Sequence, residues 1–352
     1  MILYRKERGL TMIRFDSDYI EGCIPEILEA LSSTNFEQTP GYGEDVHCTH
    51  AKELIKETFN CENSDVYFLS GGTQANVTVI SSILRPHQGA VCADSGHIHV
   101  HETGAIEACG YKCLTIPSSD GKIYAKDINK LIKDHFESDV APHMVQPGII
   151  YISFPTENGT LYSKQELEEI YSVAKEYSIP LFIDGARLGY ALASDKNDVD
   201  IKDIAKLCDV FYIGGTKVGA LFGEAVVINN DKYKKDFKYH IKQHGGMLAK
   251  GRVLGIQFEE LFKNNKYMEI SKHCIDMANI LTQGFIDKGY TFKYEAETNQ
   301  LFPIISKDKI KELKENFGFS FWEAYDEDHD VVRFVTSFMS KKENIDKLID
   351  AL

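Results

Sequence analysis

Residues 180–187 read Pro-Leu-Phe-Ile-Asp-Gly-Ala-Arg, and residues 210–217 read Val-Phe-Tyr-Ile-Gly-Gly-Thr-Lys. In both segments a short apolar run is followed by a polar side chain, Asp184 in the first and Lys217 in the second. Runs that are apolar on both faces are typical of strands buried in a mainly parallel sheet. Because α/β proteins bind ligands beyond the carboxyl ends of such strands, Asp184 and Lys217 are expected where a ligand would bind.

Other segments extend this pattern along the chain. Further apolar runs lie at residues 66–69, 148–154 and 225–228. Residues 163–177 place Leu167, Ile170, Tyr171 and Ala174 at helical spacing on one face. Buried strands that alternate with amphipathic helices predict an α/β fold, with a mainly parallel central sheet covered by helices.

The chain is too long for a single core and is expected to form two domains. It has 352 residues, more than one compact hydrophobic core normally holds. After about residue 255 the pattern shifts to helical segments at 256–262 and 270–288, and then to strand-like residues 290–305. We expect an N-terminal segment over residues 1–50, a large domain over 51–255 and a smaller α/β domain over 256–352.

Composition and charge argue against several classes of partner. The net charge of −14 opposes nonspecific attraction to nucleic acid or to an anionic membrane. The eight cysteines are scattered, with no Cys-x-x-Cys pair, and are interpreted as reduced thiols. Residues 1–12 lack the apolar region of a secretion signal, and Met12 is an alternative start. No apolar stretch approaches the roughly 20 residues of a membrane span, so the expected location is the cytoplasm.

Residues 70–76, Ser-Gly-Gly-Thr-Gln-Ala-Asn, are a candidate phosphate site. They follow a predicted strand and open a predicted helix. Glycine lets the backbone approach an anion, and the free N–H groups of a helix N-terminus favour phosphate. The alternative is a tight turn capped by Ser or Thr.

Asp184 and Lys217 each have a purely structural alternative as well. Asp184 could pair locally with Arg187 or cap a helix, and Lys217 could be a surface lysine in a loop. However, Gly214, Gly215 and Gly219 leave room for a planar ligand beside Lys217, and desolvation would lower the pKa of its amine and make it nucleophilic.

The three features together predict a pyridoxal 5'-phosphate (PLP) site. Lys217 would form the Schiff base, Asp184 would keep the pyridine nitrogen protonated, and the helix N-terminus at Gly72 and Thr73 would bind the phosphate.

Two clusters of basic side chains remain. His97, His99 and His101 would share one face of a strand and indicate a metal. If a helix begins near Glu102 and Gly104 instead, only His97 lies at the sheet edge, where its ring can stack on a planar cofactor. The run Lys232, Lys234, Lys235, Lys238 and Lys242 is interpreted as a solvated helix face, although Lys242 or Lys250, beside Gly245 and Gly246, could reach a phosphate.

The chain resembles the low-specificity L-threonine aldolase and phenylserine aldolase group, a β-eliminating lyase branch of the fold-type I PLP-dependent, transferase-like enzymes. The resemblance spans nearly the whole chain and is carried by Phe15-Asp-Ser-Asp18, Pro40-Gly-Tyr-Gly-Glu-Asp45, Gly72-Thr73, His97, Glu102-Thr-Gly104, Asp184-Gly-Ala-Arg187, Gly214-Gly-Thr-Lys217, residues 242–254 and Arg333-Phe-Val-Thr336.

The resemblance implies a role for each residue of the site. Lys217, His97 and Asp184 would be catalytic, with His97 stacked on the ring. The residues that would bind the cofactor are Gly72, Thr73, Gln74, His97, Asp184, Arg187, Thr216, Lys217, Lys242 and Lys250, with no metal. Those that would bind the substrate are Ser17, Tyr42, His101, Arg187 and Arg333.

The resemblance also implies an assembly and a reaction. Residues 1–50 would lie at the subunit interface of a homodimer with shared active sites, often doubled to a tetramer, with Tyr42 and residues 242–252 reaching a neighbouring site. A β-hydroxy-α-amino acid would be cleaved to glycine and an aldehyde. Two departures concern the substrate and the phosphate: His101 replaces the tyrosine of a number of relatives, and Ala249-Lys250 stands where many have arginine. The alternatives are a β-eliminating lyase or aminotransferase, a PLP-binding regulator and a metal hydrolase.

Overall fold

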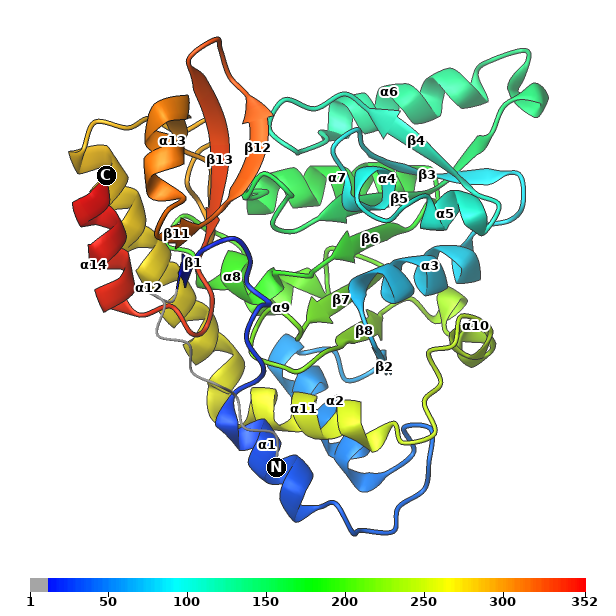
Figure 1. The fold of residues 1–352 in the computed structure, drawn as a ribbon. Helices are drawn as coiled ribbons and strands as arrows, with labels where there is room; N and C mark the ends of the chain where they lie inside the picture. Colours follow the sequence, from blue (N-terminus) through cyan, green and yellow to red (C-terminus); the bar gives the residue numbers. More distant parts are fainter. Residues whose placement is uncertain (1–11) are drawn as a thin grey trace.

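The computed structural model describes residues 12–352, and a seven-stranded sheet forms its centre (Figure 1). The strands lie in the order β2 (Asp65–Leu69), β8 (Glu224–Ile228), β7 (Val210–Gly214), β6 (Leu181–Asp184), β5 (Gln146–Ser153), β3 (Gln88–Ala93) and β4 (Lys112–Ile116). Strand β8 is antiparallel to β2 and β7, and the other pairs are parallel. The predicted mainly parallel sheet is therefore confirmed, and it includes β3 and β4, which the apolar runs did not reveal.

Both faces of the sheet are covered by helices. In β7, Phe211 and Ile213 pack into one core while Val210 and Tyr212 pack into the other, as alternating side chains of a doubly covered strand must. The first core involves α2 (Val46–Phe59), α6 (Ala125–Phe136), α7 (Lys164–Glu176) and α11 (Arg252–Phe262). The second involves α3 (Gly72–Ile83), α4 (His97–Val100), α5 (Ala105–Ala108) and α10 (Phe237–Gln243).

Helix α7 confirms the predicted amphipathic pattern. Leu167, Ile170 and Ala174 are buried, and Ser163 begins the helix through a capping box with Glu166, which satisfies backbone N–H groups that the first turn would leave unpaired. Short helices α8 (Leu188–Ala193) and α9 (Ile201–Ile204) connect β6 to β7. These connections hold the carboxyl ends of β5, β6 and β7 at one edge of the sheet.

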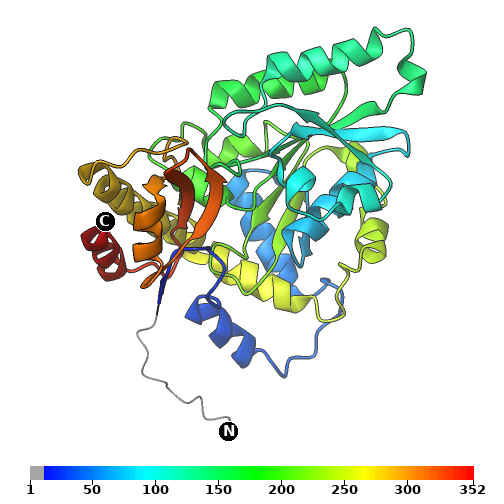
Figure 2. The ribbon, with the colours of Figure 1, turned by 45° about the horizontal axis from the view of Figure 1, so that its top comes forward.

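A third core belongs to the C-terminal part of the chain (Figure 2). Helices α12 (Lys266–Asp287), α13 (Lys307–Leu313) and α14 (Lys342–Ala351) accompany β9 (Gln300–Leu301), β10 (Ile304–Ser306), β12 (Ser320–Ala324) and β13 (His329–Val335). The first half of α12 packs into the large core through Ile270 and Ile275, and its second half packs into the small core through Leu281 and Phe285. Residue 255, the expected boundary, lies inside α11.

The N-terminal segment contacts both parts. Strand β1 (Ile13–Arg14) pairs in parallel with β11 (Phe317–Gly318), and Phe15 belongs to the small core, with its ring 6.2 Å from that of Phe334. The chain then forms α1 (Pro25–Ser33), which packs against α11. Residues 1–11, on which the expectation about a secretion signal and the alternative start depends, lie outside the described residues.

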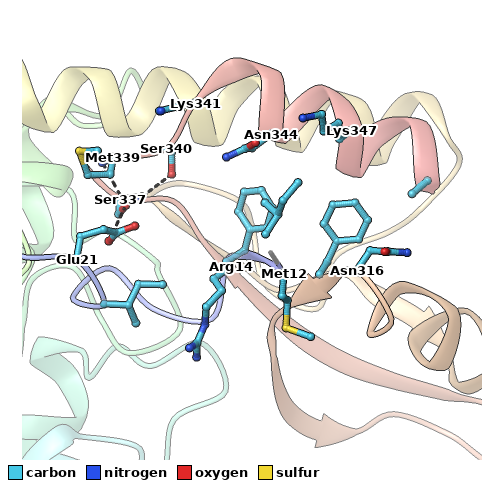
Figure 3. Close-up of a pocket in the computed structure, with 15 residues that line it drawn as sticks. Met12, Arg14, Glu21, Asn316, Ser337, Met339, Ser340, Lys341, Asn344 and Lys347 are labelled. Carbon is cyan, nitrogen blue, oxygen red and sulfur yellow. Dashed lines mark hydrogen bonds between the residues drawn. The ribbon is translucent and has the colours of Figure 1, made fainter. Parts of the chain in front are cut away.

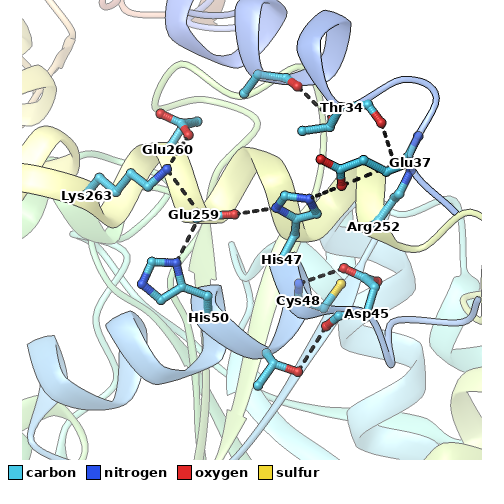
Figure 4. A network of polar contacts seen from close by, with 12 residues as sticks. Thr34, Glu37, Asp45, His47, Cys48, His50, Arg252, Glu259, Glu260 and Lys263 are labelled. Carbon is cyan, nitrogen blue, oxygen red and sulfur yellow. Dashed lines mark hydrogen bonds and ion pairs between the residues drawn. The ribbon is translucent and has the colours of Figure 1, made fainter. Parts of the chain in front are cut away.

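A polar network joins α2 to α11 (Figure 4). Glu259 of α11 contacts the Nδ1 atoms of His47 and His50 at 2.8 and 3.0 Å, and the other nitrogen of His47 lies 2.9 Å from Glu37. The pKa of His47 is raised because these carboxylates outweigh the opposing effect of burial. The network fixes the N-terminal loop to the large domain. Among residues 12–352, no helix has the length and hydrophobicity that a membrane crossing requires.

Candidate active site

A cavity of about 300 Å³ lies at the edge of the sheet where β5, β6 and β7 end. Its lining includes these predicted residues: Gly72, Thr73, His97, Asp184, Arg187, Thr216 and Lys217. The segments that carry them are far apart in sequence, and the parallel strands bring them together, as predicted for Asp184 and Lys217.

Asp184 is fixed at the end of β6 by a full set of donors. Its side chain is 3% exposed. Tyr151 donates to Oδ2 at 2.6 Å, Asn76 donates to the same oxygen at 3.1 Å, and the Ala186 backbone N–H donates to Oδ1 at 3.0 Å. The suggested local ion pair with Arg187 is wrong, because the guanidinium of Arg187 binds Asp18 instead. Asp184 is thus a rigid carboxylate at the cavity wall.

Lys217 lines the cavity and is only partly exposed, so the surface-loop alternative is wrong. Burial lowers the pKa of its amine, the charge of Arg187 lowers it further, and the opposing charges of Asp18, Asp184 and Glu224 do not compensate. The backbone carbonyl of Lys217 accepts from the Tyr190 hydroxyl at 2.5 Å. A desolvated amine with a lowered pKa has the lone pair that a nucleophilic lysine requires.

The N-terminus of α3 lies at the cavity, which Gly72 and Thr73 line. Gly71 caps this helix without a side-chain hydrogen bond, and its first turn contains no acidic residue, so the capped-turn alternative does not describe it. A Cβ atom on Gly72 would lie 3.0 Å from the Tyr212 hydroxyl, which explains why glycine occupies this position. The Gln74 side chain lies elsewhere: it accepts from Ser70 and donates to the His244 carbonyl.

His97 begins the short helix α4, so the shared strand face is not found. A separate helix, α5, begins after Gly104, as the alternative expected. Its Nδ1 lies 2.7 Å from Glu102 Oε1, and its backbone N–H donates to Glu157 at 2.9 Å. Burial lowers the pKa of His97, but the Glu102 hydrogen bond and the charge of Asp184 outweigh this effect and raise it overall.

Arg187 is held by a buried carboxylate. Its Nε and Nη2 atoms donate to Asp18 at 2.7 and 3.0 Å, and Asn299 donates to the same carboxylate at 3.0 Å. The Asp18 side chain has no solvent exposure. This pair aims Arg187 into the cavity while joining the N-terminal segment to α8.

Three of the other predicted substrate residues, Ser17, His101 and Arg333, do not line the cavity in this chain. Arg333 donates to Gln300 and to the Asp16 carbonyl, both at 3.3 Å. Arg333 Nε and Ser17 Oγ are buried without a partner among residues 12–352. Two unpaired donors beside the cavity suit an anionic group that the protein itself does not provide.

His101 belongs to an aromatic wall next to these donors. Its ring lies 5.6 Å from that of His97 and 6.4 Å from that of Trp322, and the Arg333 guanidinium lies 5.4 Å from the Trp322 ring. Burial, followed by the charges of His97 and Arg333, lowers the pKa of His101. Trp322 was not predicted from the sequence, because only the position of β12 in the folded chain brings its ring beside His101 and Arg333.

Tyr42, Lys242 and Lys250 lie outside the Lys217 cavity of this chain. Lys242 Nζ is 5.5 Å from the centre of the Tyr42 ring, and the Tyr42 backbone N–H donates to the Ala249 carbonyl at 3.3 Å. The two segments therefore form one surface feature, although not a part of this chain's own cavity.

Three glutamates at the site were not predicted as site residues, and two of them, Glu102 and Glu224, are buried. Glu102 Oε1 accepts a hydrogen bond from the Asn76 side chain and is hydrogen-bonded to His97 Nδ1. Glu157 accepts from Ser153 at 2.6 Å, and burial raises its pKa. Glu224 lines the cavity beside Lys217. Glutamate is mostly exposed in proteins, so residue type alone did not indicate these three.

A larger groove, of about 940 Å³, lies elsewhere and has different chemistry (Figure 3). It runs between Arg14, Asn316, Ser340 and Lys347, and in Figure 3 Ser337 connects Glu21 with Ser340. It contains no buried lysine and carboxylate pair. The metal hypothesis finds no support from the three histidines either: within the described chain, the single candidate ligand group joins His99 to Glu107 and Cys113, not to His97 or His101.

The fold and the cavity define a class. The mainly parallel sheet with a lysine in the cavity and a fixed carboxylate at adjacent strand ends, beside a free helix N-terminus, is the architecture of fold-type I PLP-dependent enzymes. The aspartate aminotransferase of Thermus thermophilus superimposes with a TM-score of 0.70 over 97% of this chain and 91% of that one, at 12% identity, so this likeness concerns the fold alone.

The family follows from closer matches. Residues 15–308 match the beta-eliminating lyase family, and the chain belongs to it. A Leishmania major threonine aldolase structure has a TM-score of 0.93 and 42% identity, covering 96% of this chain and 98% of that one. A low-specificity L-threonine aldolase from a Pseudomonas species is 29% identical over 313 residues, 88% of each chain.

Proposed function

We propose that this protein is a PLP-dependent aldolase that cleaves a β-hydroxy-α-amino acid to glycine and an aldehyde. The observation that carries the proposal is that Lys217 and the fixed carboxylate of Asp184 line one cavity together with the open N-terminus of α3. The names of the relatives, threonine aldolases at 42% and 29% identity, support the same reaction.

The residues present fit the cofactor. Lys217 would hold its aldehyde carbon, Asp184 its ring nitrogen, and the backbone of Gly72 and Thr73 its phosphate, with Thr216 beside the phosphate. When bound, PLP supplies an electron sink for the carbon whose bond to Cβ is broken.

The side chains of the chain would then bind and position the amino acid. Arg187, aimed by Asp18, and Arg333, whose Nε is unpaired, would hold its carboxylate, because a guanidinium matches a carboxylate in a bidentate geometry. Ser17 would add a hydrogen bond. Fixing the carboxylate sets which bond at Cα stands perpendicular to the ring, and this geometry selects Cα–Cβ cleavage over loss of the Cα proton.

His97 would move the proton. Its Nδ1 is engaged by Glu102, so Nε2 is the nitrogen available to accept the β-hydroxyl proton. Since the pKa of His97 is raised, the imidazole becomes an acceptor only as pH rises through that value. His101 and the Trp322 ring would border the space for the β-substituent.

The test combines labelling with product analysis. Borohydride reduction of the yellow holoprotein should attach the cofactor to the peptide that contains Lys217, and Lys217→Ala should lose the colour. Incubation with threonine, allo-threonine and phenylserine should release glycine and the matching aldehyde. Label on a different lysine would overturn the cofactor assignment.

The family also contains β-eliminating lyases, which use the same lysine and carboxylate. Ammonia with a keto acid, in place of glycine with an aldehyde, would assign the protein to β-elimination, and transfer of the amino group would assign it to transamination.

We also propose a homodimer with shared sites, doubled to a tetramer. Several large apolar side chains of the N-terminal segment and α10 are exposed: Leu28, Phe36, Tyr42, Val46 and Tyr239. Phe36 is 93% exposed, and exposed apolar groups of this size mark interaction surfaces. Tyr42, Lys242 and Lys250 lie together on this surface and would reach the neighbouring cavity, where a lysine would contact the cofactor phosphate.

Residues 1–50 would then form the interface segment, residues 51–255 the cofactor domain and residues 256–352 the small domain. We place the protein in the cytoplasm, where its eight free cysteines would stay reduced, and expect amino acids, not nucleic acids or membranes, as its partners.

A further inference from the structure

Glu224 is the least expected side chain of the cavity. It begins β8, pairs in register with Leu69 of β2 and Gly214 of β7, and is only 4% exposed. The phosphate-site segment follows Leu69 and the Lys217 segment follows Gly214. Glu224 therefore lies between the two segments.

The hydrogen bonds of Glu224 are incomplete. Thr216 Oγ1 donates to Oε1 at 3.1 Å and itself accepts from the Gly223 backbone N–H at 2.9 Å. Oε2 is buried and has no partner among the described residues. A buried carboxylate with one unpaired oxygen is costly, and a buried carboxyl group avoids this cost by keeping its proton.

The charges around Glu224 point the same way. Asp184 of β6 lines the same cavity, and its charge raises the pKa of Glu224. The charge of Glu224 in turn raises the pKa of Tyr212 on β7 and of Tyr267 on α12. Lys217 is the opposing cation. Burial raises the pKa of Glu224 to about 8, although Lys217 and the Thr216 hydrogen bond lower it, whereas burial lowers the pKa of Lys217. The pKa values of the two groups are thus shifted toward each other.

We propose that Glu224 is the proton-exchange partner of Lys217, a neutral acid that gives its proton to the lysine amine when that amine is released and takes it back when the amine reacts again. The proton moves from Glu224 Oε2 to the Nζ lone pair, leaving a carboxylate beside an ammonium group, and then returns. No other bond is involved. This role rests on the proposed function, because it deepens the part that Lys217 plays there.

A neutral Glu224 has a second effect that fits the cavity. An ionised carboxylate beside Ser70, Gly71 and Gly72 would repel the phosphate bound there, whereas a neutral acid does not. Because Glu224 keeps its proton at neutral pH, Lys217 remains the nucleophile of the site and residues 70–72 keep their affinity for an anion.

The experiment measures protonation directly in the cofactor-free protein. Difference infrared spectra of wild type against Glu224→Gln should show the carbonyl band of a protonated carboxylic acid at pH 7, and this band should disappear with a midpoint near pH 8. Glu157→Gln is the matched control, since it removes another acid that lines the cavity and should leave the Glu224 band and midpoint in place. Absence of a Glu224 band at pH 7 overturns the proposal.

Two further measurements distinguish proton exchange between Glu224 and Lys217 from a Glu224 that is protonated only because it is buried. Lys217→Met should move the Glu224 midpoint to higher pH, because the lysine charge lowers it in the wild type; an unmoved midpoint means that the groups do not interact. If Glu224→Gln does not fold, the comparison of wild type with Lys217→Met tests the proposal alone. The carbonyl band whose midpoint moves in Lys217→Met is then assigned to Glu224.

In the holoprotein, stopped-flow mixing with glycine should show a roughly hundredfold slower exchange of Lys217 for the added amine in Glu224→Gln, the usual scale of acid–base assistance. Exchange at the wild-type rate refutes the proposal. Normal infrared results without aldol cleavage of any amino acid would instead refute the proposed function.

Discussion

Replacing Asp18 with asparagine should destabilise the protein strongly. The Asp18 carboxylate is fully buried and accepts two bonds from Arg187, at 2.7 and 3.0 Å, and one from Asn299. Asp18→Asn keeps the shape of the side chain but leaves the Arg187 charge buried and uncompensated. Removing one partner of a buried ion pair costs about 3–5 kcal/mol. We expect a loss of this size in the free energy of unfolding.

The neighbouring acid provides a matched control. Asp16 pairs with Arg14, whose side chain is 56% exposed, and exposed pairs contribute about 0–1 kcal/mol. Urea unfolding followed by circular dichroism and by Trp322 fluorescence should therefore place the Asp16→Asn midpoint close to that of the wild type and the Asp18→Asn midpoint far below it. The double variant Asp18→Asn/Arg187→Met should recover part of the loss, because the buried charge is gone.

The pH dependence gives a second measure of the same pair. Burial alone would raise the pKa of Asp18, but the charges of Arg187 and Lys217 and the hydrogen bonds from Arg187 and Asn299 together outweigh it and lower the pKa. A carboxyl group whose pKa is lower in the folded state stabilises the fold fully above its unfolded pKa of about 3.9, and this stabilisation is lost as pH falls through the folded value. Asp18→Asn should lack this acid-dependent loss. Equal stability of Asp16→Asn and Asp18→Asn would refute the reasoning.

Three further predictions concern catalysis. Arg333→Lys should raise KM for every active amino acid while leaving the cofactor absorption nearly unchanged, since lysine lacks the bidentate geometry; an unchanged KM removes Arg333 from the carboxylate site. Mixing Lys217→Ala chains with Tyr42→Ala chains should restore activity, because one site of each hybrid dimer has both native residues, and active monomers would exclude shared sites. His97→Asn should keep the cofactor colour but lower kcat roughly a hundredfold, with His99→Asn as the control, and cleavage at the native rate would end the proposed role of His97.

Much of the fold was predictable because its strands are apolar on both faces. Residues 210–213 and 181–183 are continuous apolar runs, and the polar residue after each run had to lie at the sheet edge. Strand β3 was missed because Gln88 and Gly89 begin it, and β4 because Lys112 and Thr115 interrupt its apolar pattern. Strand burial there is decided by tertiary packing, which overrides the local pattern.

The glutamates of the site were missed for a different reason, although the sequence around Glu224 contains a pattern that could have indicated its position. Glu224 directly precedes the apolar run at residues 225–228. In a parallel strand this start would lie at the edge away from the ligand. Because β8 is antiparallel, its start lies at the carboxyl end of β7. A short connection between residues 214 and 224, too short for a crossover helix, indicated that reversal.

Arg187 was predicted as a site residue, but the sequence could not indicate the side chain that binds it. The Asp-Gly-Ala-Arg segment identified Arg187 as a candidate, but its partner Asp18 is 169 positions away. Pairings at such separations depend on the arrangement of whole domains, and a single sequence contains no local pattern for them.

The pairing of β1 with β11 has a consequence for how the chain is made. Ile13 lies beside Phe317, and Phe15 packs with Phe334, so the first described strand leaves the ribosome long before its partners exist. The large sheet can assemble during synthesis, but the small domain must wait for the last segment, because domains fold as units as they emerge. A message cut short before residue 317 would therefore yield chains whose Phe15 has no core to enter, which chaperones and proteases can recognise.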